Sequence, residues 1–350
     1  MQGKEAIWDL PNVTMPAKFF TSDLELRNQL DIILETLWES FPQLIQNQIA
    51  LTWIRYDPPY RVNTGGALSA EDFWKYTPKG ISYRGVELAD PGGMAHLFYL
   101  VATHVWLEQG MVQPSAEIDR AMADMLTRGS HDATSFLIDV LSGTTSGPTL
   151  PPGPAETWAA QRNIVNRYFE SLGWPELRPS NLNQKTWCDG PYGRERDFLG
   201  KTFENRNQLT TEATARLLHS MVGGVSVSSA RSQTMLELMK QSQENSPITQ
   251  GLPASANVWA KSAIAPHIRH EAAYIEAEST HPYLLVVFTE GQLTKSPYSA
   301  RLSSSGPSAG LSAGLSQLGS PSPDHPQASE IISFISQQIF DAAQQQKLKP

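Results

Sequence analysis

The sequence contains a single cysteine, has no long apolar run and carries little charge. Cys188 alone cannot form a disulfide within the chain. No stretch reaches the roughly 18 apolar residues that a membrane-spanning helix needs, so we expect no membrane span. Residues 1–11 carry charges and no apolar run, which does not fit a secretory signal. A cytoplasmic protein is therefore expected.

Charged residues make up 18% of the 350 residues, and the formal net charge is -8. An acidic balance without blocks of like charge argues against a nucleic-acid surface. The eight histidines show no metal-binding spacing such as His-Glu-x-x-His. We therefore expect no metal, no cofactor and no nucleic-acid partner. The length suffices for one large domain or two modest ones.

Apolar periodicity divides the chain into a helical middle and strands nearer its two ends. Alternating residues near 49–54 indicate one strand, and the segments 258–261, 272–276 and 283–289 fit an antiparallel meander. The segment 299–328 is almost entirely Ser, Gly, Pro, Leu and Ala, which is typical of a flexible linker. The predicted organisation is an irregular N-terminal segment over 1–21, a domain over 22–298, this linker, and a C-terminal helix over 329–350.

The predicted C-terminal helix has an apolar face made of Ile331, Ile335 and Ile339. Because the linker separates it from the domain, we expect the tail to be dispensable for the fold. An apolar helix face of this kind is suited to binding a partner protein. One interpretation of the chain is accordingly an assembly or scaffold factor that acts through its tail.

The stretch Asp90–Leu100 leads into an apolar helix. Gly93 and His96 are three residues apart, so they project from the same face of its first turn. Further on, Asp132-Ala133-Thr134 begins another helix, and Trp259-Ala260-Lys261-Ser262-Ala263 ends a strand. Taken in order, over roughly residues 24–291, such segments resemble the class A β-lactamase and penicillin-binding-protein family of serine hydrolases.

That resemblance implies an α/β (α+β) fold in which an antiparallel sheet lobe, built from both ends of the chain, lies beside an all-helical lobe. It also implies a functional site between the lobes. The family's Ser-x-x-Lys, Ser-Asp-Asn and Lys-Thr-Gly motifs would fall, respectively, on Gly93 and His96, on Gly129, Ser130 and His131, and on Lys261, Ser262 and Ala263. A register one residue later for the second motif would instead give Ser130, His131 and Asp132.

Gly93 has no side chain, so the chain lacks an oxygen nucleophile where the family has its serine. We therefore expect a non-catalytic binding or interaction protein, a pseudoenzyme. Two alternatives stay open: an active hydrolase of amides or esters with relocated catalytic residues, and the scaffold factor described above. The residues expected to contact a ligand are Lys261, Ser262, His96, Ser130 and Glu195.

The expected ligand is an anionic small molecule or an acidic side chain of a protein partner. Lys261 would hold the anion and protonated His96 would strengthen the binding, so affinity should fall as pH rises through the histidine pKa. Plainer interpretations compete with these roles. His96 would only fill space, Ser130 would cap a helix, and Glu195 would pair internally with Arg194 and Arg196.

Overall fold

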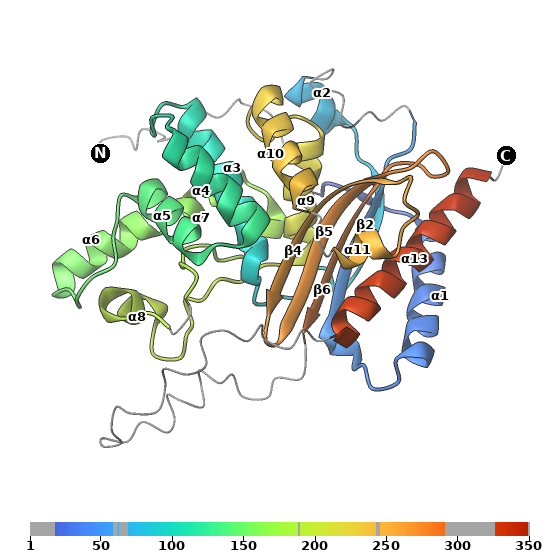
Figure 1. Cartoon of the computed structure of the whole chain (residues 1–350), viewed down its shortest axis with the longest axis horizontal. Coiled ribbons are helices and arrows are strands. Elements are labelled where there is room, and N and C mark those ends of the chain that lie inside the picture. The colour runs from blue at the N-terminus through green and yellow to red at the C-terminus, as the bar shows by residue number, and fades with distance from the viewer. Residues whose placement is uncertain are drawn as a thin grey trace.

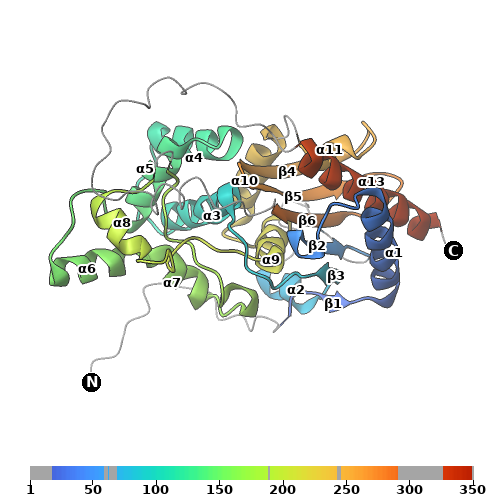
Figure 2. The same ribbon diagram turned by 90° about the horizontal axis from the view of Figure 1, so that it is seen from below.

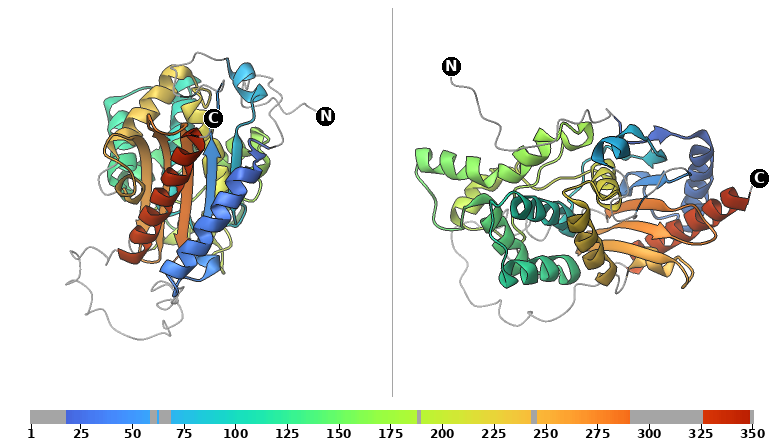
Figure 3. Two further views of the ribbon diagram at one scale, coloured as in Figure 1. Left: turned by 90° about the vertical axis from the view of Figure 1, so that its right-hand side faces the viewer. Right: turned by 90° about the horizontal axis from the view of Figure 1, so that it is seen from above.

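The structure, a computed structural model, describes residues 18–58, 62, 69–187, 190–242, 246–290 and 326–348. A six-stranded sheet forms one lobe, and a group of helices forms the other (Figure 1). Seen from below, the helical lobe lies on one side of the sheet, and two further helices cover the opposite face (Figure 2). Figure 3 shows those two helices side by side on the outside of the sheet.

The strand order of the sheet joins the two ends of the chain, because N-terminal β2 pairs with C-terminal β6. All neighbouring strands are antiparallel except β1 and β3. The order β1-β3-β2-β6-β5-β4 leaves β4 at one edge. The strands are β1 (Thr21–Ser22), β2 (Ile49–Arg55), β3 (Lys79–Tyr83), β4 (Asn257–Ala265), β5 (Ile268–Glu276) and β6 (Tyr283–Glu290). The predicted fold class is confirmed.

The outer face of the sheet is covered by α1 (Leu24–Ser40), α11 (Pro247–Gln250) and α13 (Pro326–Leu348). Asp23 caps α1 by accepting a hydrogen bond from the Leu26 backbone N–H at 3.0 Å. Apolar residues on both faces of the central strands explain why a second layer is needed.

The C-terminal helix is part of this layer. Ile331, Ile335 and Ile339 are buried against the outer face of the sheet. The expectation that they bind a partner is wrong, because their apolar face is already covered within the chain. Of the predicted linker, residues 299–325 lie outside the described residues, as do residues 1–17 of the predicted N-terminal segment.

The other lobe is helical. Its helices, with α2 at the edge of the sheet, are α2 (Ala70–Lys75), α3 (Ala95–Glu108), α4 (Ala116–Arg128), α5 (His131–Ser142), α6 (Pro152–Arg162), α7 (Ile164–Ser171), α8 (Gly193–Leu199), α9 (Thr211–Val222) and α10 (Ser229–Gln241). The short 3₁₀ helices are η1 (Gln46–Gln48), η2 (Gly92–Met94) and η3 (Pro175–Leu177). In the part of the chain that the structure describes, every helix is too short or too polar to cross a bilayer.

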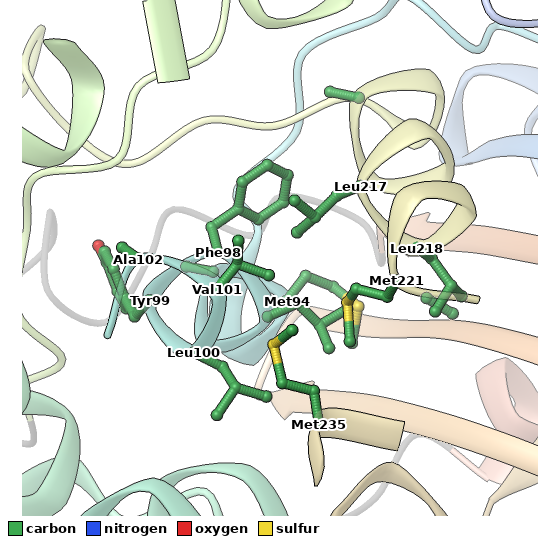
Figure 4. Packing of buried hydrophobic residues seen from close by; sticks show 14 of the residues in the cluster. Met94, Phe98, Tyr99, Leu100, Val101, Ala102, Leu217, Leu218, Met221 and Met235 are labelled. Atoms are coloured by element: carbon green, nitrogen blue, oxygen red, sulfur yellow. The ribbon is translucent and has the colours of Figure 1, made fainter. Parts of the chain in front are cut away.

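Helix α3 runs through the centre of this lobe and is buried on every side from Ala95 to Leu107. Helices that are apolar all round belong inside large cores, which is why its sequence shows no clean stripe. Figure 4 shows how its start is fixed: Met94 and Phe98 point toward Leu217, Met221 and Met235 from α9 and α10. The N-terminal end of α3 is therefore held rigidly beside the sheet.

Candidate functional site

The glycine turn η2 brings the start of α3 against the edge of the sheet. Gly93 has no Cβ, and a Cβ built there would lie 3.5 Å from the Ala263 Cβ on β4 and 3.5 Å from His96 Nδ1. These are ordinary van der Waals distances, so the turn tolerates a side chain at residue 93. At Gly92 the φ angle is +46°, and a Cβ would meet Ile268 Cδ1 at 2.5 Å, so this position requires glycine.

Lys261 lies on the face of β4 that points toward the helical lobe, the same face as Ala263. Only 4% of the residue is exposed. Burial lowers the pKa of its ammonium to about 8; Glu271 raises that pKa and Arg269 lowers it further. Among the described residues no group accepts a hydrogen bond from Lys261 Nζ. The site thus contains a buried cation without a bonded anion.

His96 faces the same place from α3 and is 2% exposed. Its Nε2 lies 3.3 Å from Thr134 Oγ1. Burial lowers the pKa of the imidazole to about 3, with Lys261 and His131 acting in the same direction and the Met125 carbonyl opposing them. His96 is therefore neutral at physiological pH. The expectation that a protonated His96 attracts the anion is wrong, because the burial that the sequence could not reveal excludes the charge.

Ser130 and its neighbours are explained by two helix ends. Gly129 has a φ of +65° and ends α4 in the left-handed conformation, and Ser130 Oγ accepts a hydrogen bond from the Ala133 backbone N–H at 3.2 Å. His131, the first residue of α5, is exposed. The Ser130 hydroxyl thus has a structural partner in the helix that it caps.

Ser262 projects from the opposite face of β4, as successive residues of a strand must. Its hydroxyl donates to Glu271 Oε1 at 3.0 Å, and Glu271 Oε2 accepts from the Ile248 backbone N–H at 2.8 Å. Ser262 is therefore part of the outer layer, and the structure does not bring it together with Lys261 and His96.

Glu195 lies in the helical lobe and is fully buried. It accepts a hydrogen bond from Arg162 at 2.6 Å and from Ser146 at 2.9 Å, and Lys185 Nζ lies 3.8 Å away. Lys185 also contacts Asp139 at 2.7 Å. An internal ion-pair network is therefore present.

The partners expected for Glu195 are wrong. Arg194 instead donates to the Pro148 carbonyl at 3.1 Å, and Arg196 donates to the Gly200 carbonyl at 2.6 Å. Cys188 and Asp189, which neighbour this segment in sequence, lie outside the described residues.

Sequence reasoning missed the role of Asp90, which precedes the glycine turn. Its Oδ1 accepts from the Gly92 N–H at 3.1 Å, and its carbonyl accepts from His270 Nε2 at 2.8 Å. Its Oδ2 lies 3.9 Å from His267 Nε2, and this contact raises the pKa of His267. These contacts join the turn to β5 and to the hairpin before it; an Asp directly before Pro-Gly-Gly was the available signal.

Comparisons with known proteins agree with this architecture. A family model described as the β-lactamase enzyme family matches residues 133–342, which is more than half of the chain but begins after Gly93 and His96. The chain is similar in fold to a β-lactamase from Sphaerobacter thermophilus (TM-score 0.55, 14% identity, covering 91% of this chain and 98% of the other).

Two further solved structures show the same likeness. One is PBP-A (TM-score 0.55, 14% identity, 94% of this chain and 98% of that one). The other is an ancestral class A β-lactamase reconstructed for Gram-negative bacteria (TM-score 0.54, 14% identity, 87% and 99%). At these identities the likeness establishes the fold alone. No curated protein sequence matches the chain.

Proposed function

Because the chain belongs to the β-lactamase enzyme family, we propose that it is a non-catalytic member that binds a small anion at Lys261. The observation that carries the proposal is the buried ammonium of Lys261, which lies on the face of β4 that packs against the glycine turn and to which no described residue is hydrogen-bonded. Members of the family recognise an anionic ligand and also attack it. This chain has the groups needed for recognition but not those needed for the attack.

The absence of catalysis follows from the groups around Gly93. Covalent catalysis needs an oxygen or sulfur nucleophile with a base within hydrogen-bond reach. Gly93 offers neither atom, and the pKa of about 3 makes His96 a weak base for activating water at neutral pH. Ser130 and Glu195, the other candidates for relocated chemistry, are engaged in a helix cap and a buried ion pair.

The affinity for an anion follows from the energetics of Lys261. A pKa near 8 leaves about nine-tenths of the lysine charged at pH 7, and the downward shift corresponds to about 3 kcal/mol against the charged form. An anion in contact with Nζ would offset this desolvation, since charge-assisted hydrogen bonds strengthen where water is excluded. With the residue 4% exposed, the ligand that fits must be small.

Two measurements test the proposal. Intact-protein mass spectrometry after incubation with penicillin G and with a fluorophosphonate should show the unmodified mass, whereas a stoichiometric adduct on a serine would establish the relocated hydrolase instead. The control is an active class A β-lactamase treated identically, which must acquire the adduct. Binding of the anion is tested by titrating wild-type protein and Lys261→Met with acetate, which should bind only to the wild type.

A further inference from the structure

The Thr134 hydroxyl determines which nitrogen of His96 carries the proton. A threonine hydroxyl has one hydrogen, and Thr134 Oγ1 donates it to the Ser130 carbonyl at 2.7 Å. His96 Nε2 lies 3.3 Å from the same hydroxyl oxygen, so Nε2 must be the donor of this second bond. The Met125 carbonyl also accepts from the ring, and because Nδ1 has no partner among the described residues this contact agrees with a proton on Nε2. In a neutral imidazole the other nitrogen, Nδ1, then has no proton and is an acceptor.

That acceptor lies beside the glycine turn. His96 Nδ1 is buried and has no hydrogen-bond partner among the described residues, and it lies 3.5 Å from the position of a Cβ on Gly93. A buried acceptor left without a donor is destabilising, because it has lost its hydrogen bonds to water and gained none in return. Two buried polar groups therefore lack partners among the described residues. The Lys261 ammonium has no anion, and His96 Nδ1 has no hydrogen-bond donor.

Proximity of the two groups is supported by their electrostatics. Lys261 lowers the pKa of His96 by direct charge repulsion. Lys261 and Ala263 project from the same face of β4. A Cβ on Gly93 would lie 3.5 Å from both Ala263 Cβ and His96 Nδ1, so Ala263 and His96 flank the same point. A ligand at Lys261 thus lies beside His96 Nδ1.

We infer that the anion held by Lys261 also carries a hydrogen-bond donor next to its carboxylate, as an α-hydroxy acid does, and that His96 Nδ1 accepts this hydrogen bond. The inference rests on the proposed function, since it assigns the second contact of the same ligand. Because His96 Nδ1 can only accept, it attracts a hydroxyl group of the ligand and repels a carbonyl or carboxylate oxygen at the same position. His96 is thereby the residue that determines specificity among small acids.

The tautomer can be tested without any ligand. In protein labelled with ¹⁵N-histidine, long-range ¹H–¹⁵N spectra at pH 7 should show His96 Nε2 protonated and Nδ1 unprotonated. The signals are assigned by their loss in His96→Phe. A protonated Nδ1 would overturn the inference, because the site would then offer a donor and select the opposite chemistry.

Ligand selection is tested with glycolate and acetate, two acids that differ by one hydroxyl. Wild-type protein should bind glycolate at least about fivefold more tightly than acetate, the effect of one net hydrogen bond. His96→Phe should bind both acids equally, and Lys261→Met should weaken both to the same extent. Thermal melting of both variants verifies that they are folded.

The outcomes separate the two proposals. Equal binding of glycolate and acetate to wild-type protein would overturn the role of His96 while leaving the anion site at Lys261 intact. Binding of neither acid, or binding that Lys261→Met does not change, would overturn the proposed function itself and the inference with it. A glycolate preference that persists in His96→Phe would assign the donor contact to another group and so overturn the inference.

Discussion

The His270 side chain donates a 2.8 Å hydrogen bond from Nε2 to the Asp90 carbonyl, which ties the glycine turn to strand β5. Its other nitrogen, Nδ1, accepts from the Thr289 backbone N–H at 3.1 Å. The ring therefore serves both neighbours only in its neutral form, and burial lowers its pKa to about 4. The position of Gly93 relative to the sheet therefore depends on the neutral form of His270.

Acid should destabilise the protein through such histidines. Burial lowers the pKa values of His96 and His219 to about 3 and of His104 and His270 to about 4. The unfolded chain then binds protons below about pH 6.5 that the folded chain does not, so stability falls as pH decreases from about 6.5 toward 4.

Each fully buried histidine contributes up to about 2 kcal/mol of this loss at pH 5. Urea unfolding from pH 7 to pH 4.5 measures it, with His270→Gln as the comparison. A free energy of unfolding that stays constant over this range would contradict the account.

Removing the apolar contact of the C-terminal helix should destabilise the whole domain. Ile335 is fully buried on α13, so Ile335→Ala should cost about 2–4 kcal/mol. The matched control is Ile32→Ala on α1, where the side chain is 62% exposed and the loss should stay below about 0.5 kcal/mol. Thermal or denaturant unfolding distinguishes them, and equal effects of the two variants would show that α13 does not stabilise the sheet.

Breaking the buried ion pair in the helical lobe should be costly. Among the described residues, Glu195→Gln leaves the fully buried Arg162 guanidinium with Asp139, 3.2 Å away, as its remaining charged partner, and we expect the free energy of unfolding to fall by about 3 kcal/mol. Glu117→Gln is the control, because its pair with Arg120 is exposed and screened by water, so its loss should leave the stability almost unchanged. An unchanged melting temperature for Glu195→Gln would refute the structural role of the network.

Much of the fold was predictable from the sequence, because strands and capped helices carry local signals. The alternation in β2 and the apolar segments within β5 and β6 predicted strands, and Ser130 predicted a helix start. The tail helix was also predictable. The burial of this helix was not predictable. Its amphipathic sequence shows that one face must pack against an apolar surface, but it does not identify that surface.

The site was less predictable than the fold. One error was avoidable, because strand alternation alone shows that Ser262 and Lys261 face opposite ways. The other two errors have physical causes that no local pattern expresses. The partner of Glu195, Arg162, is 33 residues away along the chain, so no local pattern connects them. The charge state of His96 depends on its burial among α3, α4 and α5, which no spacing in the sequence expresses.

The affinity for a small anion should depend on pH through Lys261. The ammonium is charged below its pKa of about 8 and neutral above it, so acetate binding should be constant below about pH 7 and weaken as pH rises through 8. A bound anion stabilises the charged form and moves this midpoint upward. NMR titrations at pH 5.5, 7, 8 and 9.5 measure the trend. Weakening between pH 5.5 and 7 would instead indicate a histidine.

Replacing Gly93 by serine should not restore hydrolysis. The backbone at Gly93 accepts a Cβ, so the hydroxyl would reach His96 Nδ1, but an imidazole with a pKa of about 3 removes a proton poorly. We expect Gly93→Ser to fold and to turn over nitrocefin no faster than wild type, with Gly93→Ala as the control. Turnover by Gly93→Ser alone would show that His96 is a competent base.

The central claim is that Lys261 binds a small anion, and acetate titration of wild-type protein and Lys261→Met at pH 7 tests it most directly. The signals to follow are the backbone amides of Gly93 and Ala263 in ¹H–¹⁵N spectra at constant ionic strength. The account predicts saturable shifts in wild-type protein that are absent from folded Lys261→Met. Identical titration curves for the two proteins, or no shifts in either, would contradict it.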